Sequence, residues 1–427
     1  MTQVVDLLVV GASEVISSAT AMPPARGPDL DTLRVLTDSA IAVDDGRIVA
    51  VGTSSGVREG YRGEREIDAA RCVVSPGLVD PHVHLVHAGS RHEEYEAIVT
   101  GEGGAAARLE GGINFTVTRT RAASDEELSA GARRDLDLML RNGVTTIEAK
   151  SGYGLDPEHE LRLLRIQAGL DHAVDIVPTY LGAHVVPSGV ARDGYVAEVI
   201  ATLSEARALA EYCDVFCDPA AFSIAETRAI CEAAMALGFR IRLHADQTGP
   251  VGAAELAAEL GAASADHLDH VSSQGIAALA EASVTAVVLP AVALHMMEVT
   301  PGYSDGSFTA APKQDLVEVV HRMKDACVPL ALSTDYNPGT SPTPSMPLAM
   351  QLAARLFRLG YAAIWNMATV NAAYALDRAD DRGLLEPGMR ADLVVWDVPH
   401  HGMVINRLGY EMARTVIKNG AVAYERV

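Results

Sequence analysis

The sequence predicts a mixed α/β fold: a (β/α)8 barrel of the TIM type and a small β-sandwich domain built from both ends of the chain. The length of 427 residues is enough for a barrel of about 250–300 residues and a smaller module. Short alternating runs with tight turns stand at both ends of the chain. Between them, apolar runs alternate with alanine- and leucine-rich helical stretches, which is typical of a parallel sheet covered by helices.

The two ends of the chain have the same hairpin pattern. The run IAVDDGRIVAVG places Asp45-Gly46 between two alternating stretches, as a two-residue hairpin turn requires. TVIKNGAVAYERV places Asn419-Gly420 in the same way. We therefore expect residues 1–75 and 381–427 to form one β-sandwich domain together.

Residues 76–380 are expected to form the barrel. AICEAAMALGFRIRLHAD and VHRMKDACVPLALSTD each read as a helix, a turn of small residues and a buried strand. Repeated alternation of this kind predicts parallel strands, and the segment is long enough for eight repeats. The irregular stretch 300–312 follows a predicted strand, so we expect it to cover the mouth of the barrel.

Composition excludes several classes of partner. With 34 basic and 56 acidic residues the net charge is −22, which argues against nucleic acid and means that an acidic substrate needs a local cationic anchor. No apolar run approaches the roughly 20 residues that span a membrane. The amino terminus lacks the basic region of a secretory signal, so we expect a cytoplasmic protein.

The odd number of cysteines, five, argues against disulfides, and for Cys213 and Cys217 buried thiols are favoured over a metal pair.

A set of four side chains predicts a metal site. In PGLVDPHVHL, His82 and His84 are two residues apart after an apolar strand, so both imidazoles face the barrel interior. His244 in RIRLHADQ and Asp335 in PLALSTDYNPGTSP stand at the ends of later strands. Three histidines and one carboxylate leave one coordination position open, as a catalytic zinc-like ion requires. The alternatives are a core histidine and a helix-capping aspartate.

Further polar side chains follow other predicted strands. SADHLDHVS places Asp266 and His267 at a strand end, where a histidine can orient a water or move its proton. The alternative is a histidine hydrogen-bonded within a polar loop, which we favour for His270. Tyr153, in EAKSGYG, and His184, in LGAHVVP, are expected to point across the barrel mouth.

Arg91, in AGSRHEEYE, lies just beyond the first two predicted ligands. A planar guanidinium near a metal centre suits bidentate capture of a substrate carboxylate. A surface salt bridge to Glu93 or Glu94 is the alternative.

These stretches resemble the imidazolonepropionase family of the metal-dependent amidohydrolases. KSGYG and TDYNPGTSPT are the most specific motifs, and the resemblance extends along most of the predicted barrel. It implies opening of the five-membered ring of 4-imidazolone-5-propanoate to N-formimidoyl-glutamate, with one zinc or iron per chain, in a homodimer. It also implies the following site: metal ligands His82, His84, His244 and Asp335; substrate contacts Arg91, Tyr153 and His184; and Gln247 and His267 close to the reacting centre.

Asp335, His267 and Gln247 are our candidate catalytic residues. Asp335 is expected to accept a proton from the attacking water and pass it to the leaving ring nitrogen, while His267 orients the water. Lys150 can be read as a carboxylated lysine that bridges two metals in some amidohydrolases. Because four ligands already complete a mononuclear site, we favour Lys150 as the ion-pair partner of a barrel carboxylate.

Two stretches depart from the family pattern and leave other functions open. TGEGGAAARLEGGI lacks the usual tyrosine and has only Gly111-Gly112, and AVALHMM replaces a glycine and aromatic residues. A related cyclic amide or amidine is therefore an alternative substrate. A deaminase is a second alternative, but HADQTGP places Gln247 where a proton-shuttling carboxylate would be expected. A scaffold protein without turnover is the non-enzymatic alternative.

Overall fold

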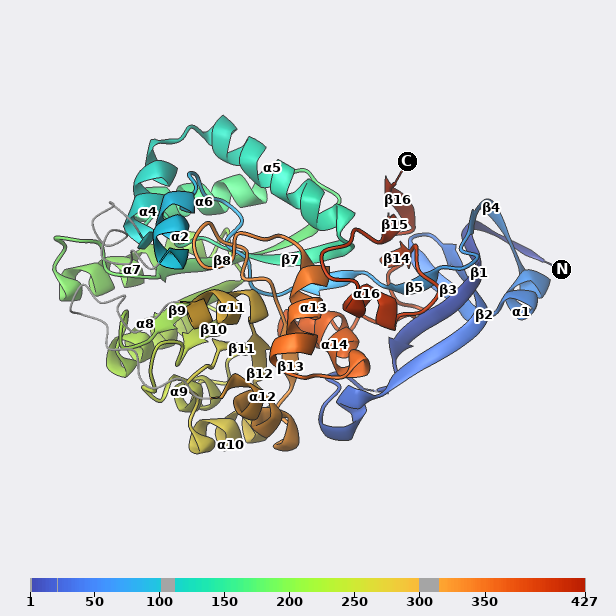
Figure 1. Cartoon of the computed structure of the whole chain (residues 1–427). Helices are drawn as coiled ribbons and strands as arrows, with labels where there is room; N and C mark the ends of the chain where they lie inside the picture. Colours follow the sequence, from blue (N-terminus) through green and yellow to red (C-terminus); the bar gives the residue numbers. More distant parts are fainter. Residues whose placement is uncertain (1, 21, 101–111, 299–314, 427) are drawn as a thin grey trace.

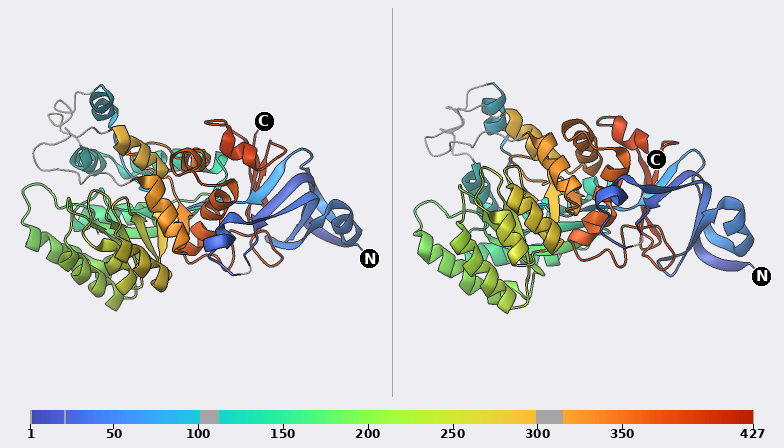
Figure 2. Two further views of the ribbon diagram at one scale, coloured as in Figure 1. Left: turned by 60° about the horizontal axis from the view of Figure 1, so that its bottom comes forward. Right: turned by 90° about the horizontal axis from the view of Figure 1, so that it is seen from below.

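Two eight-stranded sheets organise the part of the chain that the computed structural model describes, residues 2–20, 22–100, 112–298 and 315–426. The barrel and the smaller sheet lie beside each other, and strands from both ends of the chain belong to the smaller sheet (Figures 1 and 2). The stretch 300–312 that we expected over the barrel mouth lies outside the described residues. Among the helices described, none is long and apolar enough to cross a membrane.

The larger sheet is a parallel barrel in which each strand pairs with the next one along the chain. Next to the first and last strands, a bridge between Val83 and Tyr336 links the two edges, and His84 N donates to Tyr336 O over 2.9 Å. The predicted eight-fold barrel is confirmed. Its strands are β6 (Leu78–Asp80), β7 (Val144–Lys150), β8 (Asp175–Ala183), β9 (Tyr212–Cys217), β10 (Arg240–Ala245), β11 (Ser264–His267), β12 (Thr285–Val288) and β13 (Leu330–Leu332).

Helices surround the barrel strands (Figure 1). Strands β7, β11 and β12 are buried at every position, which explains why they read as short apolar runs. Capping boxes begin two of the helices: Ser124 with Glu127, and Ser223 with Glu226. The helices from the barrel to the carboxyl end are α2 (His92–Val99), α4 (Gly112–Ala122), α5 (Asp125–Arg141), α6 (Pro157–Ala168), α7 (Arg192–Ala206), α8 (Ile224–Ala236), α9 (Ala253–Glu259), α10 (Ser273–Ala282), α11 (Pro290–Glu298), α12 (Leu316–Asp325), α13 (Met346–Leu356), α14 (Tyr361–Ala368), α15 (Val370–Ala375) and α16 (Gly402–Asn406).

The smaller sheet joins strands from both ends of the chain, as predicted. Its order is β16-β15-β14-β5-β1-β2-β3, with β4 paired to β1. Ile41 and Ile48 from one end of this path pack in one cluster with Leu393 and Ile417 from the other, so the sheet folds over its own core. Its elements are β1 (Gln3–Ser18), η1 (Gly27–Asp31), β2 (Leu33–Asp44), β3 (Arg47–Thr53), α1 (Ser54–Gly60), β4 (Tyr61–Asp68), β5 (Val73–Pro76), β14 (Leu393–Trp396), β15 (Ala413–Lys418) and β16 (Ala421–Glu425).

Both predicted hairpin turns are present in this sheet. Asp45-Gly46 joins β2 to β3 and Asn419-Gly420 joins β15 to β16, with positive φ at all four residues. The two turns also touch, since a Cβ on Gly46 would lie 3.0 Å from the carbonyl oxygen of Asn419. Glycine at position 46 therefore adopts the left-handed backbone without strain and leaves room for the other hairpin turn to approach closely.

Candidate active site

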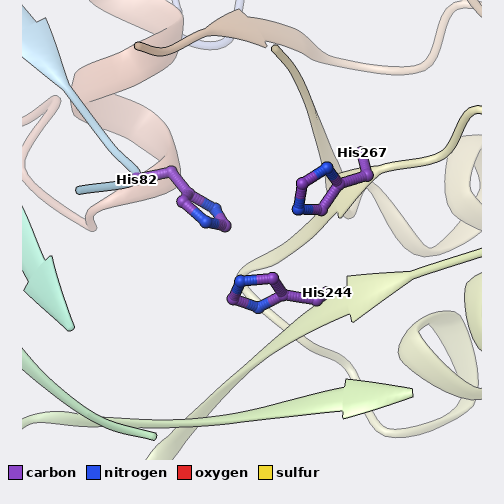
Figure 3. Close-up of side chains that lie close together, drawn as sticks. All are labelled: His82, His244 and His267. Atoms are coloured by element: carbon purple, nitrogen blue, oxygen red, sulfur yellow. The ribbon is translucent and has the colours of Figure 1, made fainter. Parts of the chain in front are cut away.

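Three buried imidazoles converge inside the barrel near the carboxyl ends of its strands. His82 follows β6, His244 lies in β10 and His267 ends β11, and Figure 3 shows their rings turned towards a common centre. The rings of His82 and His244 are 4.5 Å apart between centroids. One nitrogen from each of the three rings lies within 4.8 Å of the others, the spacing of a shared cation site.

Asp335 and His84 complete the group of predicted ligands. Asp335 Oδ1 lies 3.4 Å from His82 Nε2 and 3.3 Å from His84 Nε2. His84 also belongs to a close group with His184 and His244. The structure therefore brings His82, His84, His244 and Asp335 together in overlapping groups.

The chemistry of these side chains fits a divalent cation. Among the described residues, His82 Nε2, His84 Nδ1, Asp335 Oδ1 and both ring nitrogens of His267 are buried without a hydrogen-bond partner. Burial lowers the pKa of His82, His84 and His267 well below the usual range of histidine. The imidazoles of His82, His84 and His267 are therefore neutral, which is the form that binds metals, and a cation among them would satisfy buried lone pairs.

Asp335 is held in an uncommon conformation beside this group. The φ angle of Asp335 is +49° and that of His267 is +74°. Both lie in the left-handed region, which residues other than glycine rarely adopt. Burial raises the pKa of Asp335 to about 7. Such strained backbone is typical of sites whose side chains must point in one direction.

Asp80, which the sequence analysis missed, holds the segment that carries Asp335. Its carboxylate accepts hydrogen bonds from Thr334 N at 3.0 Å, from Thr334 Oγ1 at 2.6 Å and from Ser333 Oγ. β6 is thereby tied to the segment after β13. The signal was present in the sequence, because Asp80, His82 and His84 alternate and so face the same side.

Carboxylates contact the far side of two of the imidazoles. His82 Nδ1 donates to Asp266 Oδ2 over 2.6 Å, which leaves Nε2 of the same ring with its lone pair. His244 Nδ1 lies 2.9 Å from Asp214 Oδ2 in a bent arrangement that falls short of a regular hydrogen bond. Contacts of this kind orient ligating histidines. Asp266 stood among the candidate polar residues, whereas Asp214 was missed, although a carboxylate within the apolar run YCDVFC signals a buried role.

Lys150 forms ion pairs with two buried carboxylates. Its Nζ donates to Glu148 Oε1 and to Asp214 Oδ2, both at 2.8 Å. All three side chains are fully buried. The favoured alternative for Lys150, an ion pair with a barrel carboxylate, is confirmed.

Tyr153 and His184 line the same region of the barrel. Their ring centroids are 5.6 Å apart, and the His184 ring stacks on that of His84 at 5.2 Å. His184 Nδ1 contacts the carbonyl oxygen of Gly152 at 2.9 Å, which fixes the orientation of this imidazole. Both side chains are buried. The structure therefore places both expected substrate contacts beside the predicted metal ligands.

Glu160, on α6, anchors the loop that presents Tyr153. Its carboxylate accepts hydrogen bonds from the backbone N–H groups of Gly152, Gly154 and Leu155 at 2.7–2.8 Å. This residue is 1% exposed, and burial raises its pKa. No local sequence pattern points to Glu160, because its contacts span a turn and the start of a helix.

We expect Glu160→Ala to loosen this loop, because it leaves three buried N–H groups without an acceptor. The free energy of unfolding should fall by at least about 1–3 kcal/mol. Amide hydrogen exchange over residues 151–155 should become faster than in the original protein. Glu158→Ala, an exposed position on the same helix, is the matched control and should change neither quantity. Unchanged exchange in the Glu160 variant would show that the loop holds its shape without this carboxylate.

Arg91 pairs with Glu94, one of the two salt-bridge partners considered for it. Its Nε donates to Glu94 Oε2 over 3.0 Å and its Nη2 pairs with the other oxygen, while Gly112 N donates to Glu94 over 2.6 Å. The Arg91 side chain is only 15% exposed, so this pair is not a surface contact. A Cβ on Gly339 would lie 2.0 Å from Arg91 Nη1, so the guanidinium packs against the TDYNPGTSPT motif.

Gln247 and His270 lie in the loops that follow β10 and β11. Gln247 is half-buried, and its N–H donates to Asp218 Oδ2 over 3.0 Å, which fixes the backbone three residues after His244. His270 N donates to Asp246 O over 2.9 Å, as suits the loop residue we expected. Cys213 and Cys217 are buried free thiols, as favoured.

The two stretches that depart from the family pattern are only partly described. Residues 101–111 of TGEGGAAARLEGGI lie outside the described residues, whereas AVALHMM lies in α11. There the His295 ring stacks on Tyr95 of α2 at 5.9 Å between centroids.

The fold and this site define a hydrolase of the amidohydrolase class. The sequence model of the amidohydrolase family matches residues 93–424. Solved structures share the fold at low identity. Escherichia coli guanine deaminase is 15% identical with a TM-score of 0.69 over 98% of this chain and 99% of its own. An adenosine deaminase from Xanthomonas campestris with bound zinc is 20% identical with a TM-score of 0.68 over 100% of this chain and 95% of its own.

Relatives with higher sequence identity indicate which family of amidohydrolases the chain resembles. The imidazolonepropionase of Bacillus cytotoxicus is 39% identical over 99% of this chain and 97% of its own length. That of Caldanaerobacter subterraneus subsp. tengcongensis is 40% identical over 97% of this chain and 96% of its own length. The chain belongs to the imidazolonepropionase family of amidohydrolases, which hydrolyse C–N bonds.

Proposed function

We propose that this protein opens the ring of 4-imidazolone-5-propanoate to give N-formimidoyl-L-glutamate, with one divalent zinc or iron ion per chain. The observation that carries the proposal is the buried group of His82, His84, His244 and Asp335 in a chain whose full-length relatives are imidazolonepropionases. A divalent ion bound by these residues would supply a Lewis acid that polarises a carbonyl and lowers the pKa of water.

Two side chains of the group are assigned proton and orienting roles. His267 has both ring nitrogens without a hydrogen-bond partner among the described residues, so it can orient the attacking water. Asp335 accepts a proton from that water and returns it to the ring nitrogen as the C–N bond breaks. Gln247, on the loop after His244, contributes a neutral amide near the reacting centre.

Three further side chains hold the substrate in this proposal. Arg91 binds the propanoate carboxylate, and Glu94 keeps the guanidinium in one orientation by its paired contacts. Tyr153 and His184 lie beside the ligand imidazoles and align the ring carbonyl with the centre.

Turnover of defined substrates tests this function. We expect the metal-loaded protein to convert 4-imidazolone-5-propanoate to N-formimidoyl-L-glutamate, followed by loss of the imidazolone absorbance and by mass spectrometry of the product. Hydantoins and imidazolones with and without a carboxylate serve as comparison substrates. Faster hydrolysis of another cyclic amide would favour the alternative that the departures at 100–113 and 291–297 suggest.

A deaminase reading makes a different prediction. Ammonia would appear when aminated heterocycles are supplied, and we expect none because Gln247 cannot shuttle protons as a carboxylate does.

We further propose that residues 1–75 with 381–427 and residues 76–380 are the two domains, and that the protein is a cytoplasmic homodimer. This function requires a small-molecule substrate as the partner and involves neither nucleic acid nor a membrane. The net charge of −22 supports the exclusion of nucleic acid.

A further inference from the structure

Five charged side chains form a fully buried network beneath the group of imidazoles. We define the Lys150 network as Glu148, Lys150, Asp214, Arg242 and Asp266, whose side chains are all 0% exposed. These residues lie on four barrel strands, β7, β9, β10 and β11. Burial of this much charge is costly unless each group has partners, so the network calls for a role beyond packing.

Lys150 is the centre of this network. Its ammonium donates to Glu148 Oε1 and Asp214 Oδ2 at 2.8 Å and lies 3.7 Å from Asp266 Oδ2. Asp214 Oδ2 and Asp266 Oδ2 are the same oxygens that contact His244 and His82. One ammonium therefore meets both carboxylates that orient the predicted ligands.

The network also holds the backbone on both sides of His82, the first predicted ligand. Val83 N donates to Glu148 Oε2 over 3.3 Å, and Arg242 Nη2 donates to Pro81 O over 2.8 Å. Arg242 cannot replace the lysine, since its closest approaches to Glu148 and Asp266 are 3.8 and 3.9 Å. Without Lys150 the three carboxylates would repel one another and lose their closest shared donor.

We propose that Lys150 is a positioning residue of the metal centre: one buried ammonium fixes Asp214, Asp266 and Glu148, and through them presents His82 and His244 to a divalent ion. The inference rests on the proposed metal site and assigns Lys150 a role outside the coordination sphere. Loss of such outer contacts typically weakens metal affinity by about 10- to 100-fold.

The test is zinc affinity, measured by competition with a chelating dye on demetallated protein. Lys150→Met should raise the zinc Kd by about 10- to 100-fold with the circular dichroism spectrum unchanged. Lys418→Met is the matched control, because Lys418 is also a buried lysine with two carboxylate partners. It lies in β15 of the smaller sheet and pairs with Asp392 at 2.5 Å and with Asp175 of β8 at 3.0 Å. Its zinc Kd should equal that of the original protein.

A second variant keeps the inference testable if Lys150→Met does not fold. Asp214→Asn preserves the shape of the side chain and should also weaken zinc binding. If Lys150 acts through Asp214, the double variant should lose less affinity than the two single losses combined. An unchanged Kd in either folded single variant would overturn the role of Lys150. Absence of tight zinc binding in the original protein would instead refute the proposed metal site itself.

Discussion

Asp335→Asn is expected to reduce kcat for ring opening by about 10²- to 10⁴-fold, the usual contribution of a general acid–base group. Asparagine has nearly the same volume and tolerates the left-handed φ of +49° at this position. The loss should therefore be chemical, since the amide can neither accept the proton nor carry the negative charge. Steady-state kinetics on zinc-saturated protein measures the effect.

A control variant separates loss of the catalytic carboxylate from any effect of an Asp→Asn change at a left-handed backbone position. Asp38 is exposed and also has a left-handed φ, +44°, so Asp38→Asn should leave kcat unchanged. Near-normal kcat in a metal-replete Asp335 variant would show that this residue only caps its loop.

Arg91→Met should lower kcat/KM for acidic ring substrates by about 2–4 kcal/mol of transition-state binding, because a buried charge contact to the carboxylate is lost. The effect on uncharged rings should be much smaller. Glu94 would also lose its partner in this variant, so thermal unfolding is measured alongside the kinetics.

Arg228→Met provides the comparison for Arg91. Arg228 pairs with Glu259 on the helical exterior of the barrel, and its loss should change neither substrate class. If Arg91→Met changes acidic and neutral substrates equally, the arginine supports the fold through Glu94 and does not anchor the carboxylate.

The parts that could be predicted from sequence are those with a local pattern. Asp45-Gly46 and Asn419-Gly420 need only their own backbone preferences to specify a turn. His82 and His84 alternate along one strand, and His244 and Asp335 end their own apolar runs, so barrel geometry alone predicts that the four meet.

The parts that were missed depend on partners far along the chain. Asp214 contacts Lys150 and His244, and neither contact leaves a local pattern beyond one carboxylate in an apolar strand. Glu160 acts on backbone groups of a loop, which no side-chain pattern encodes. For Arg91 both alternatives were visible in AGSRHEEYE, and only the three-dimensional placement of Glu94 shows that the salt bridge forms.

The central claim, a single metal ion that enables ring opening, is tested most directly by titrating demetallated protein with zinc or iron(II) while following turnover of 4-imidazolone-5-propanoate. Ligand atoms of Glu14, His400 and His401 also lie within 4.8 Å of one another at a partly exposed position. A His400→Ala, His401→Ala variant is therefore titrated in parallel, so that any zinc bound at this position is recognised. Activity should rise linearly and stop at one equivalent per chain in both proteins. Full activity without metal, or a break at two equivalents in both, would contradict the mononuclear site.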